Sequence, residues 1–143
     1  MKKFQFPLER VRRFRKLQME TEQVKLEQLQ AHLASIDSME AELHRQKQQA
    51  DQALVESPTV GTPELAVVDS FRAYTQRMAN IFALRRAQVQ EEILMQKENL
   101  LVARQKYEVL ERLKSNRHAK WKYDLHREVE QLATEAYLAR WNR

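Results

Sequence analysis

The sequence contains no cysteine, one glycine, three prolines and only 8% aromatic residues. Without cysteine, the chain has no disulfide framework and no thiolate metal site. A single glycine cannot build a glycine-rich phosphate-binding loop. No HExxH motif or comparable set of histidines and carboxylates occurs at metal-ligand spacing, so the four histidines are interpreted as surface residues. We therefore predict a protein that is not an enzyme and needs no cofactor.

Long apolar runs are also missing. No stretch of 18 apolar residues is present, so the sequence predicts no transmembrane segment. The basic start MKKFQFPLERVRRFRK is not followed by the apolar region of a signal peptide. Together these features predict a cytoplasmic location.

What the sequence does contain is typical of long helices. Ala, Glu, Lys, Leu, Arg and Gln dominate, and 31% of the residues are charged. The helix breakers cluster in VESPTVGTPEL, residues 55–65, which holds the glycine and two prolines. Ser57 precedes a proline and is disfavoured in a helix, Gly61 is suited to a turn, and Thr62 is suited to an N-cap before Pro63. We predict an all-α fold, an antiparallel two-helix coiled-coil hairpin over 1–143, with helices at about 7–56 and 63–141 and a turn at 57–62.

Apolar residues at alternating spacings of three and four support both helices. We call such a stripe a seam. In the first helix its apolar members are Leu26, Leu29, Leu33, Ile36, Leu43, Ala50 and Leu54. Glu40 and Lys47 are its two polar members. In the second helix the apolar and aromatic members of the seam are Phe82, Val89, Ile93, Leu100, Ala103, Tyr107, Leu110 and Trp121. Its polar members are Arg86, Gln96, Lys114 and Arg117. If the chain reverses at about residue 60, residue i of the first helix lies opposite residue 120 − i of the second.

Positive charge is concentrated in two segments that are distant in sequence. Residues 1–16 carry seven basic residues and one acidic residue, and residues 104–127 carry eight basic and three acidic residues. The hairpin brings these segments together at one end, which we interpret as a docking surface for an acidic partner. An ordinary solvated helix end is the alternative. The last 25 or so residues extend beyond the first helix, where Leu125, Val129, Leu132, Ala136 and Ala139 continue a stripe.

A second candidate surface follows the turn. Phe71, Tyr74, Met78 and Ile81 form a stripe that ends at Arg85 and is offset from the seam that begins at Phe82. These residues either pack on the first helix around Leu43, Ala50 and Leu54 or form a face for a partner.

Two stretches resemble a known family. The opening KKFQFPLERVRRFRKLQMETEQVKLEQL and the segment YEVLERLKSNRHAKWKYDLHREVEQLATEA, residues 107–136, are similar to the corresponding parts of FliJ-family flagellar export proteins. The length and two-helix layout also agree, so the resemblance covers essentially the whole chain. Residues 128–136, EVEQLATEA, depart from the usual family pattern.

The resemblance implies a component of the flagellar type III export apparatus, associated peripherally with the inner membrane. Such proteins are similar to the central stalk of rotary ATPases, insert into the hexameric export ATPase, and promote its assembly and activity. They also contact the cytoplasmic part of the export gate and the export chaperones. By this resemblance, the ATPase-binding residues are Arg10, Arg13, Arg112, Arg117 and Trp121, and the face of Phe71, Tyr74, Met78, Ile81 and Arg85 is assigned to the export gate.

Other functions fit parts of the same pattern. The equivalent stalk of a virulence injectisome differs little in sequence pattern. A basic coiled coil with interleaved aromatic residues is also compatible with nucleic-acid binding, although a longer basic stripe would be needed and no nucleic acid is expected as a partner. A purely structural coiled-coil dimer is the remaining alternative.

Overall fold

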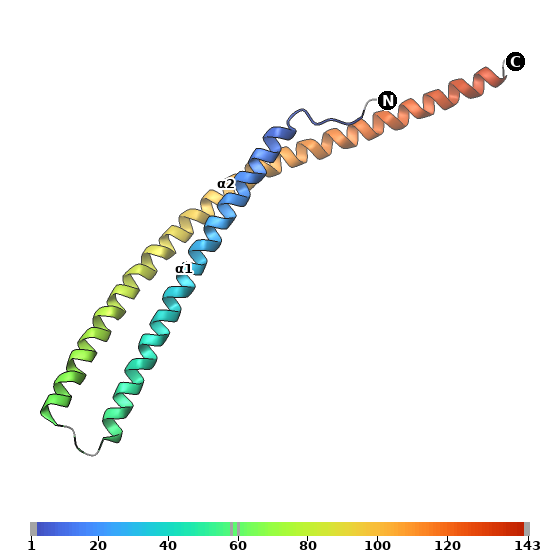
Figure 1. The fold of residues 1–143 in the computed structure, drawn as a ribbon. Coiled ribbons are helices and arrows are strands. Elements are labelled where there is room, and N and C mark those ends of the chain that lie inside the picture. Colours follow the sequence, from blue (N-terminus) through green and yellow to red (C-terminus); the bar gives the residue numbers. More distant parts are fainter. Residues whose placement is uncertain (1–2, 58, 60, 142–143) are drawn as a thin grey trace. The chain divides into compact units, whose positions relative to one another are not determined.

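The computed structural model describes residues 3–57, 59 and 61–141. Helix α1 spans Glu9–Glu56 and helix α2 spans Thr62–Trp141. The two helices pack against each other as an all-α helical hairpin, and the described residues contain no strand (Figure 1). The predicted fold class is thereby confirmed.

Contacts divide the chain into two compact units. The terminal unit combines residues 1–21 with residues 100–143, and the central unit comprises residues 22–99. In each unit, a segment of α1 packs against a segment of α2.

Apolar side chains at helical spacing form the core of each unit. In the central unit Ile36 is fully buried, and Leu26, Phe82, Val89 and Ile93 of the same seam are each no more than 8% exposed. In the terminal unit the buried apolar residues are Phe6 and Leu100. Because helices in proteins owe most of their stability to the packing of an apolar face, burial of this seam supplies much of the stability of both helices.

The register follows from side-chain contacts between the helices. In the central unit, Asp51 pairs with Arg72 at 3.2 Å, and Asp37 and Glu40 both pair with Arg86. In the terminal unit, Glu9 pairs with Lys114 at 3.0 Å. The two residue numbers of each pair add up to between 123 and 126. The predicted register, in which residue i lies opposite residue 120 − i, corresponds to a sum of 120.

The start of α1 lies two residues later than predicted, because Pro7 belongs to a turn rather than to the helix. The amide of Glu9 donates to the carbonyl of Phe6 at 3.1 Å, which closes a turn with Pro7 as its second residue. The amide of Arg12 then donates to the carbonyl of Leu8 at 2.9 Å, the first bond of the helical pattern. Leu8 is therefore the N-cap of α1.

The start of α2 corrects the predicted cap by one residue. Thr62 was expected as the N-cap, but it is the first residue of the helix and Gly61 is the cap. The Glu64 carboxylate accepts a hydrogen bond from the Gly61 amide at 3.0 Å, and the Leu65 amide donates to the Gly61 carbonyl at 3.1 Å. Gly61 does not have a positive φ. Pro58 and Val60, which belong to the predicted turn, lie outside the described residues.

Candidate partner-binding surface

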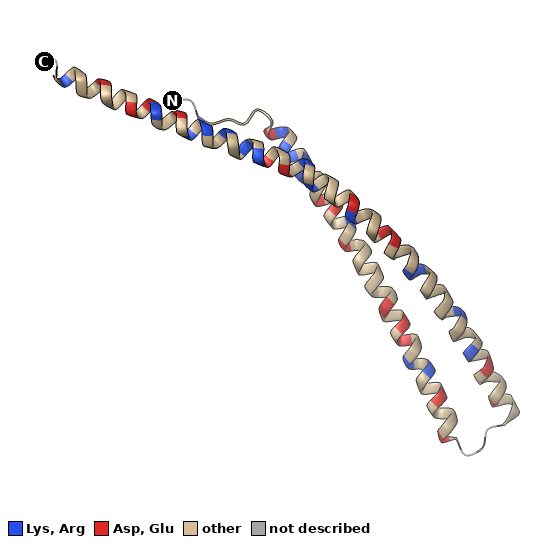
Figure 2. Ribbon diagram, turned by 180° about the vertical axis from the view of Figure 1, so that it is seen from behind, with Lys and Arg blue, Asp and Glu red and all other residues tan. Residues whose placement is uncertain are grey.

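The two basic segments of the sequence lie in the same unit. The terminal unit contains 17 lysines and arginines against eight acidic residues, a net charge of +9. The central unit contains eight basic and twelve acidic residues, a net charge of −4. Figure 2 shows basic residues on the first turns of α1 and on the stretch of α2 beside them. Charges from segments about 90 residues apart therefore contribute to one surface.

A cluster of polar side chains fixes α1 against α2 at this surface. We call it the ion-pair cluster: Glu9, Arg12, Tyr107, Glu111 and Lys114. Arg12 pairs with Glu9 at 2.7 Å and with Glu111 at 3.0 Å, and it donates to the Tyr107 hydroxyl at 3.3 Å. Hydrogen bonds from Arg12 and Lys114 lower the pKa of Glu9 to about 2. Glu9 therefore remains ionised throughout the neutral and mildly acidic range.

Aromatic side chains and one arginine join Phe4 and Phe6, which precede α1, to α2. This aromatic clasp consists of Phe4, Phe6, Arg117, His118 and Trp121. The Phe4 ring lies edge-on to His118 with centroids 4.9 Å apart, and His118 stacks on Trp121 at 5.8 Å. The Arg117 guanidinium lies 5.9 Å from the centroid of the buried Phe6 ring. The clasp thus joins Phe4 and Phe6, which precede α1, to α2.

The predicted ATPase-binding residues all lie in this unit, but they differ in what they contact. Arg10 and Arg112 are exposed and form no ion pair with any described residue. Arg13 is exposed and lies 3.5 Å from Glu9. Arg117 and Trp121 belong to the aromatic clasp, with Trp121 half-buried. Of these five residues, Arg10 and Arg112 are therefore the ones whose charge is most available to a partner.

The predicted gate face lies in the central unit and is only partly accessible. Phe71 and Met78 are half-buried, whereas Tyr74, Ile81 and Arg85 are exposed. The rings of Phe71 and Tyr74 lie 6.5 Å apart. A shallow groove of about 430 Å³ between the helices is lined by Tyr74, Met78 and Phe82 of α2 together with Met39 and Leu43 of α1. Phe71 and Met78 therefore take part in packing, whereas Tyr74, Ile81 and Arg85 are accessible.

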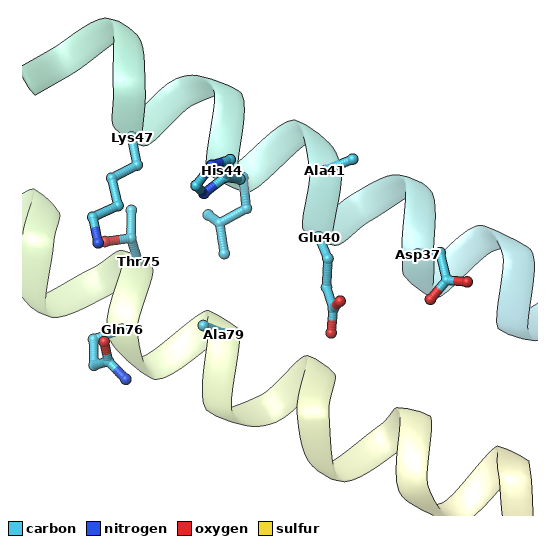
Figure 3. Close-up of a pocket in the computed structure, with 9 residues that line it drawn as sticks. Asp37, Glu40, Ala41, His44, Lys47, Thr75, Gln76 and Ala79 are labelled. Carbon is cyan, nitrogen blue, oxygen red and sulfur yellow. The ribbon is translucent and has the colours of Figure 1, made fainter. Parts of the chain in front are cut away.

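Another groove of the central unit, of about 570 Å³, lies between the two helices. Figure 3 shows Glu40 and Lys47 projecting from α1 toward α2, where the small residues Thr75 and Ala79 face them. These are the two polar members of the predicted α1 seam. Because small residues lie opposite them, the seam is not closed by apolar packing at this level. Glu40 is paired with Arg86.

Several interactions could not be read from the sequence pattern. Gln96 is buried, and its side-chain amide donates to the Glu22 carbonyl at 3.0 Å and also to the Glu22 carboxylate. The hydrogen bond from Gln96 to the Glu22 carboxylate lowers the pKa of Glu22. His118, which we interpreted as a surface residue, is half-buried in the aromatic clasp. The spacing of Phe4, Phe6, His118 and Trp121 gave no sign of the clasp, because it depends on the exact register between the segments.

Within the part of the chain that the structure describes, no group of three or more histidines and carboxylates is placed to hold a metal ion. No described helix is long and apolar enough to cross a membrane. Comparison of the chain with models of known families, with curated proteins and with solved structures finds no match.

Proposed function

We propose that this protein is a non-enzymatic component of the flagellar type III protein export apparatus. In this proposal it inserts as a stalk into the hexameric export ATPase and promotes the assembly and activity of that enzyme. It also links the ATPase to the export gate and to the export chaperones, at the cytoplasmic side of the inner membrane. The support is the resemblance of residues 2–29 and 107–136 to FliJ-family proteins, together with the helical hairpin.

The observation that carries the proposal furthest is the joining of two basic segments in the terminal unit, with its net charge of +9. Long-range attraction by such a surface would steer it toward an acidic partner and orient it there. The ion-pair cluster and the aromatic clasp hold both segments in place, so the charges are presented by an ordered surface.

The proposed action on the ATPase is mechanical and electrostatic. A single asymmetric helical hairpin inside a six-fold ring cannot contact six subunits equally. Its contacts would therefore favour particular conformations at some subunit interfaces and shift their populations. A shift of about 1.4 kcal/mol changes the ratio of two conformations about tenfold, which is a scale that a few charged contacts can reach.

Steady-state ATP hydrolysis by a flagellar export ATPase, with and without this protein, tests the proposal. We expect stimulation that decreases as salt is raised, because screening weakens contacts between exposed charges. Arg10→Glu combined with Arg112→Glu should abolish stimulation and leave helicity unchanged, since neither side chain forms an ion pair with a described residue. The matched control is Arg77→Glu with Lys97→Glu, the same charge change at exposed positions of the central unit.

Three outcomes would contradict the proposal. Stimulation could be absent at every salt concentration, it could be unaffected by the Arg10 and Arg112 reversals, or it could be lost equally in the control. Stimulation confined to an injectisome ATPase would move the protein to that secretion system. Salt-dependent binding to single-stranded nucleic acid, without any effect on the ATPase, would replace the stalk function with nucleic-acid binding.

Contact with the export gate needs variants that do not disturb packing. Tyr74→Ala and Ile81→Ala change side chains that are 47% and 44% exposed. We expect these variants to weaken binding to the cytoplasmic part of the gate without changing the midpoint of thermal unfolding by more than a few degrees. Unchanged binding would contradict the gate assignment. Phe71 and Met78 are less suitable because they are half-buried.

A further inference from the structure

The terminal unit has two apolar stripes that its own helices leave open. The N-terminal stripe lies on α1 and consists of Val11, Phe14 and Leu17, which are 42%, 55% and 61% exposed. The C-terminal stripe lies on α2 and contains Leu125, Val129, Leu132, Ala136 and Ala139. Leu125 is half-buried and the other members are exposed. Single exposed apolar residues are common, but stripes at helical spacing indicate packing against another helix.

The C-terminal stripe continues a seam that is already packed. Trp121 lies in the aromatic clasp, and Leu125 follows it one turn later on the same helix. All described residues from 126 onward are exposed. Among the described residues of the terminal unit, Figure 1 shows no other segment beside the last turns of α2. The apolar pattern of α2 thus extends beyond the point where the described part of α1 in the terminal unit covers it.

The two stripes are surrounded by opposite charges. Residues 9–17 contain five basic residues and one acidic residue, a net charge of +4. Residues 124–135 contain four acidic residues and one basic residue, a net charge of −3. This local reversal stands out within a terminal unit that is otherwise basic. Each stripe therefore complements the other both in its apolar surface and in its charge.

Within one copy the two stripes cannot meet. Arg12, which lies between Val11 and Phe14 on α1, contacts Tyr107 and Glu111 of α2. Leu132 lies 21 residues beyond Glu111 on the same continuous helix, a separation of about 30 Å at 1.5 Å per residue. The complementary stripe must therefore come from another molecule.

We propose that a second copy of this chain covers both stripes in a two-fold symmetric dimer. The C-terminal stripe of each copy packs on the N-terminal stripe of the other, so that the end of α2 becomes a third helix on the partner's hairpin. The two stripes lie at different levels along α2, so a two-fold axis parallel to α2 cannot bring them together. The axis is perpendicular to α2, and α2 of one copy runs parallel to α1 of the other.

Two-fold symmetry explains why a modest pair of stripes is sufficient. The operation forms the same helix contact twice, and stable interfaces bury about 1,600 Å² in total. It also closes the assembly at two copies, whereas a single unreciprocated contact would continue into a fibre. This inference does not rest on the proposed function, and its variants change the apolar stripes; Arg10, which is tested with the ATPase, is one of the charges around the N-terminal stripe.

The lack of cysteine makes a direct cross-linking test possible. Phe14→Cys protein is mixed with Leu132→Cys protein under mild oxidation. A disulfide needs Cα atoms within about 7 Å, so a mixed dimer forms only if the stripes of two copies meet. Val129→Cys samples the adjacent position of the C-terminal stripe. The matched control is Leu84→Cys, in the central unit and 66% exposed, which should not cross-link to Phe14→Cys.

Sedimentation of the unmodified chain over a wide range of concentration supplies the second measurement. We expect a monomer–dimer equilibrium that shifts toward monomer as salt increases. Phe14→Glu and Leu132→Glu should each weaken the dimer at least about tenfold while the helicity of the monomer is retained. Three results would each overturn the proposal: a monomer at all concentrations, mixed cross-links no more frequent than in the Leu84→Cys control, or Leu132→Cys pairing only with itself.

Discussion

Replacing Ile36 with alanine tests whether the seam between α1 and α2 stabilises the central unit. Ile36 is the largest fully buried side chain among the described residues, with 0% exposure. The substitution removes three carbon atoms, which at about 0.8 kcal/mol per buried methylene amounts to about 2.4 kcal/mol. A residual cavity would add to this loss. A hairpin seam is open at its sides and can close partly around a small gap, so we expect a total near about 2–3 kcal/mol.

Leu84→Ala is the matched control in the same unit. Leu84 is 66% exposed, so its truncation should change the free energy of unfolding by less than about 0.5 kcal/mol. Both substitutions introduce alanine into a helix, and the better helix propensity of alanine offsets part of each loss by a few tenths of a kcal/mol. The difference between the two variants therefore isolates burial.

Urea unfolding followed by far-ultraviolet circular dichroism measures both variants. With a slope of about 1–3 kcal/mol per molar urea, the midpoint for Ile36→Ala should fall by about 1–2 M, whereas that for Leu84→Ala should scarcely move. Equal shifts for the two variants would refute the reasoning, because they would show that exposure in the monomer does not determine the contribution of a side chain. A shift for Ile36→Ala equivalent to less than about 1 kcal/mol would refute it as well.

Two further predictions concern the helix starts. The pKa of Glu9 is lowered from 4.5 to about 2 in the folded state. The stabilising effect of the Glu9 carboxylate is therefore complete above the unfolded pKa and is lost as the pH falls from about 4.5 toward 2. Glu9→Gln should flatten this part of the curve of stability against pH, and an unchanged curve would exclude Glu9 as the source of the pH dependence. Gly61→Ser should raise the free energy of unfolding by about 0.5–1 kcal/mol, because serine caps a helix better than glycine and restricts the unfolded chain, and an added Cβ would meet Pro63 Cδ at an ordinary 3.6 Å. Gly61→Ala lacks the capping hydroxyl and should be about 1 kcal/mol less stable than Gly61→Ser in thermal unfolding; equal stabilities would show that the hydroxyl makes no cap.

Much of the candidate surface was accessible from charge patterning, but its internal contacts were not. The prediction that two basic segments meet required only the direction and approximate register of two helices. The distinction between Arg12, which joins the ion-pair cluster, and Arg10, which stays exposed, depends on which side of α1 each residue occupies. An error of one residue in register rotates a side chain by about 100° around the helix. Sequence patterns near the start of α1 did not fix that rotation.

The helix caps illustrate a similar limit. Pro7 and Gly61 were recognised as marking helix ends, yet both helices begin one or two residues away from the predicted positions. The cap is decided by individual hydrogen bonds, such as those from the Gly61 amide to Glu64 and from the Glu9 amide to Phe6. Several neighbouring residues can satisfy the same terminal groups, so composition alone does not choose among them.

The sequence by itself determined that two long helices form and where the chain reverses, because helical spacing and the clustering of helix breakers are local properties. It also determined that the seam is mostly apolar and that residues 1–16 and 104–127 are basic. Only the tertiary structure decided how polar members of the seam are paired, as Gln96 is with Glu22, and that Phe4 and Phe6 meet His118, Trp121 and Arg117. These contacts join residues that are 70 or more positions apart. Their geometry depends on the rotation and register of one helix against the other, which no local pattern contains.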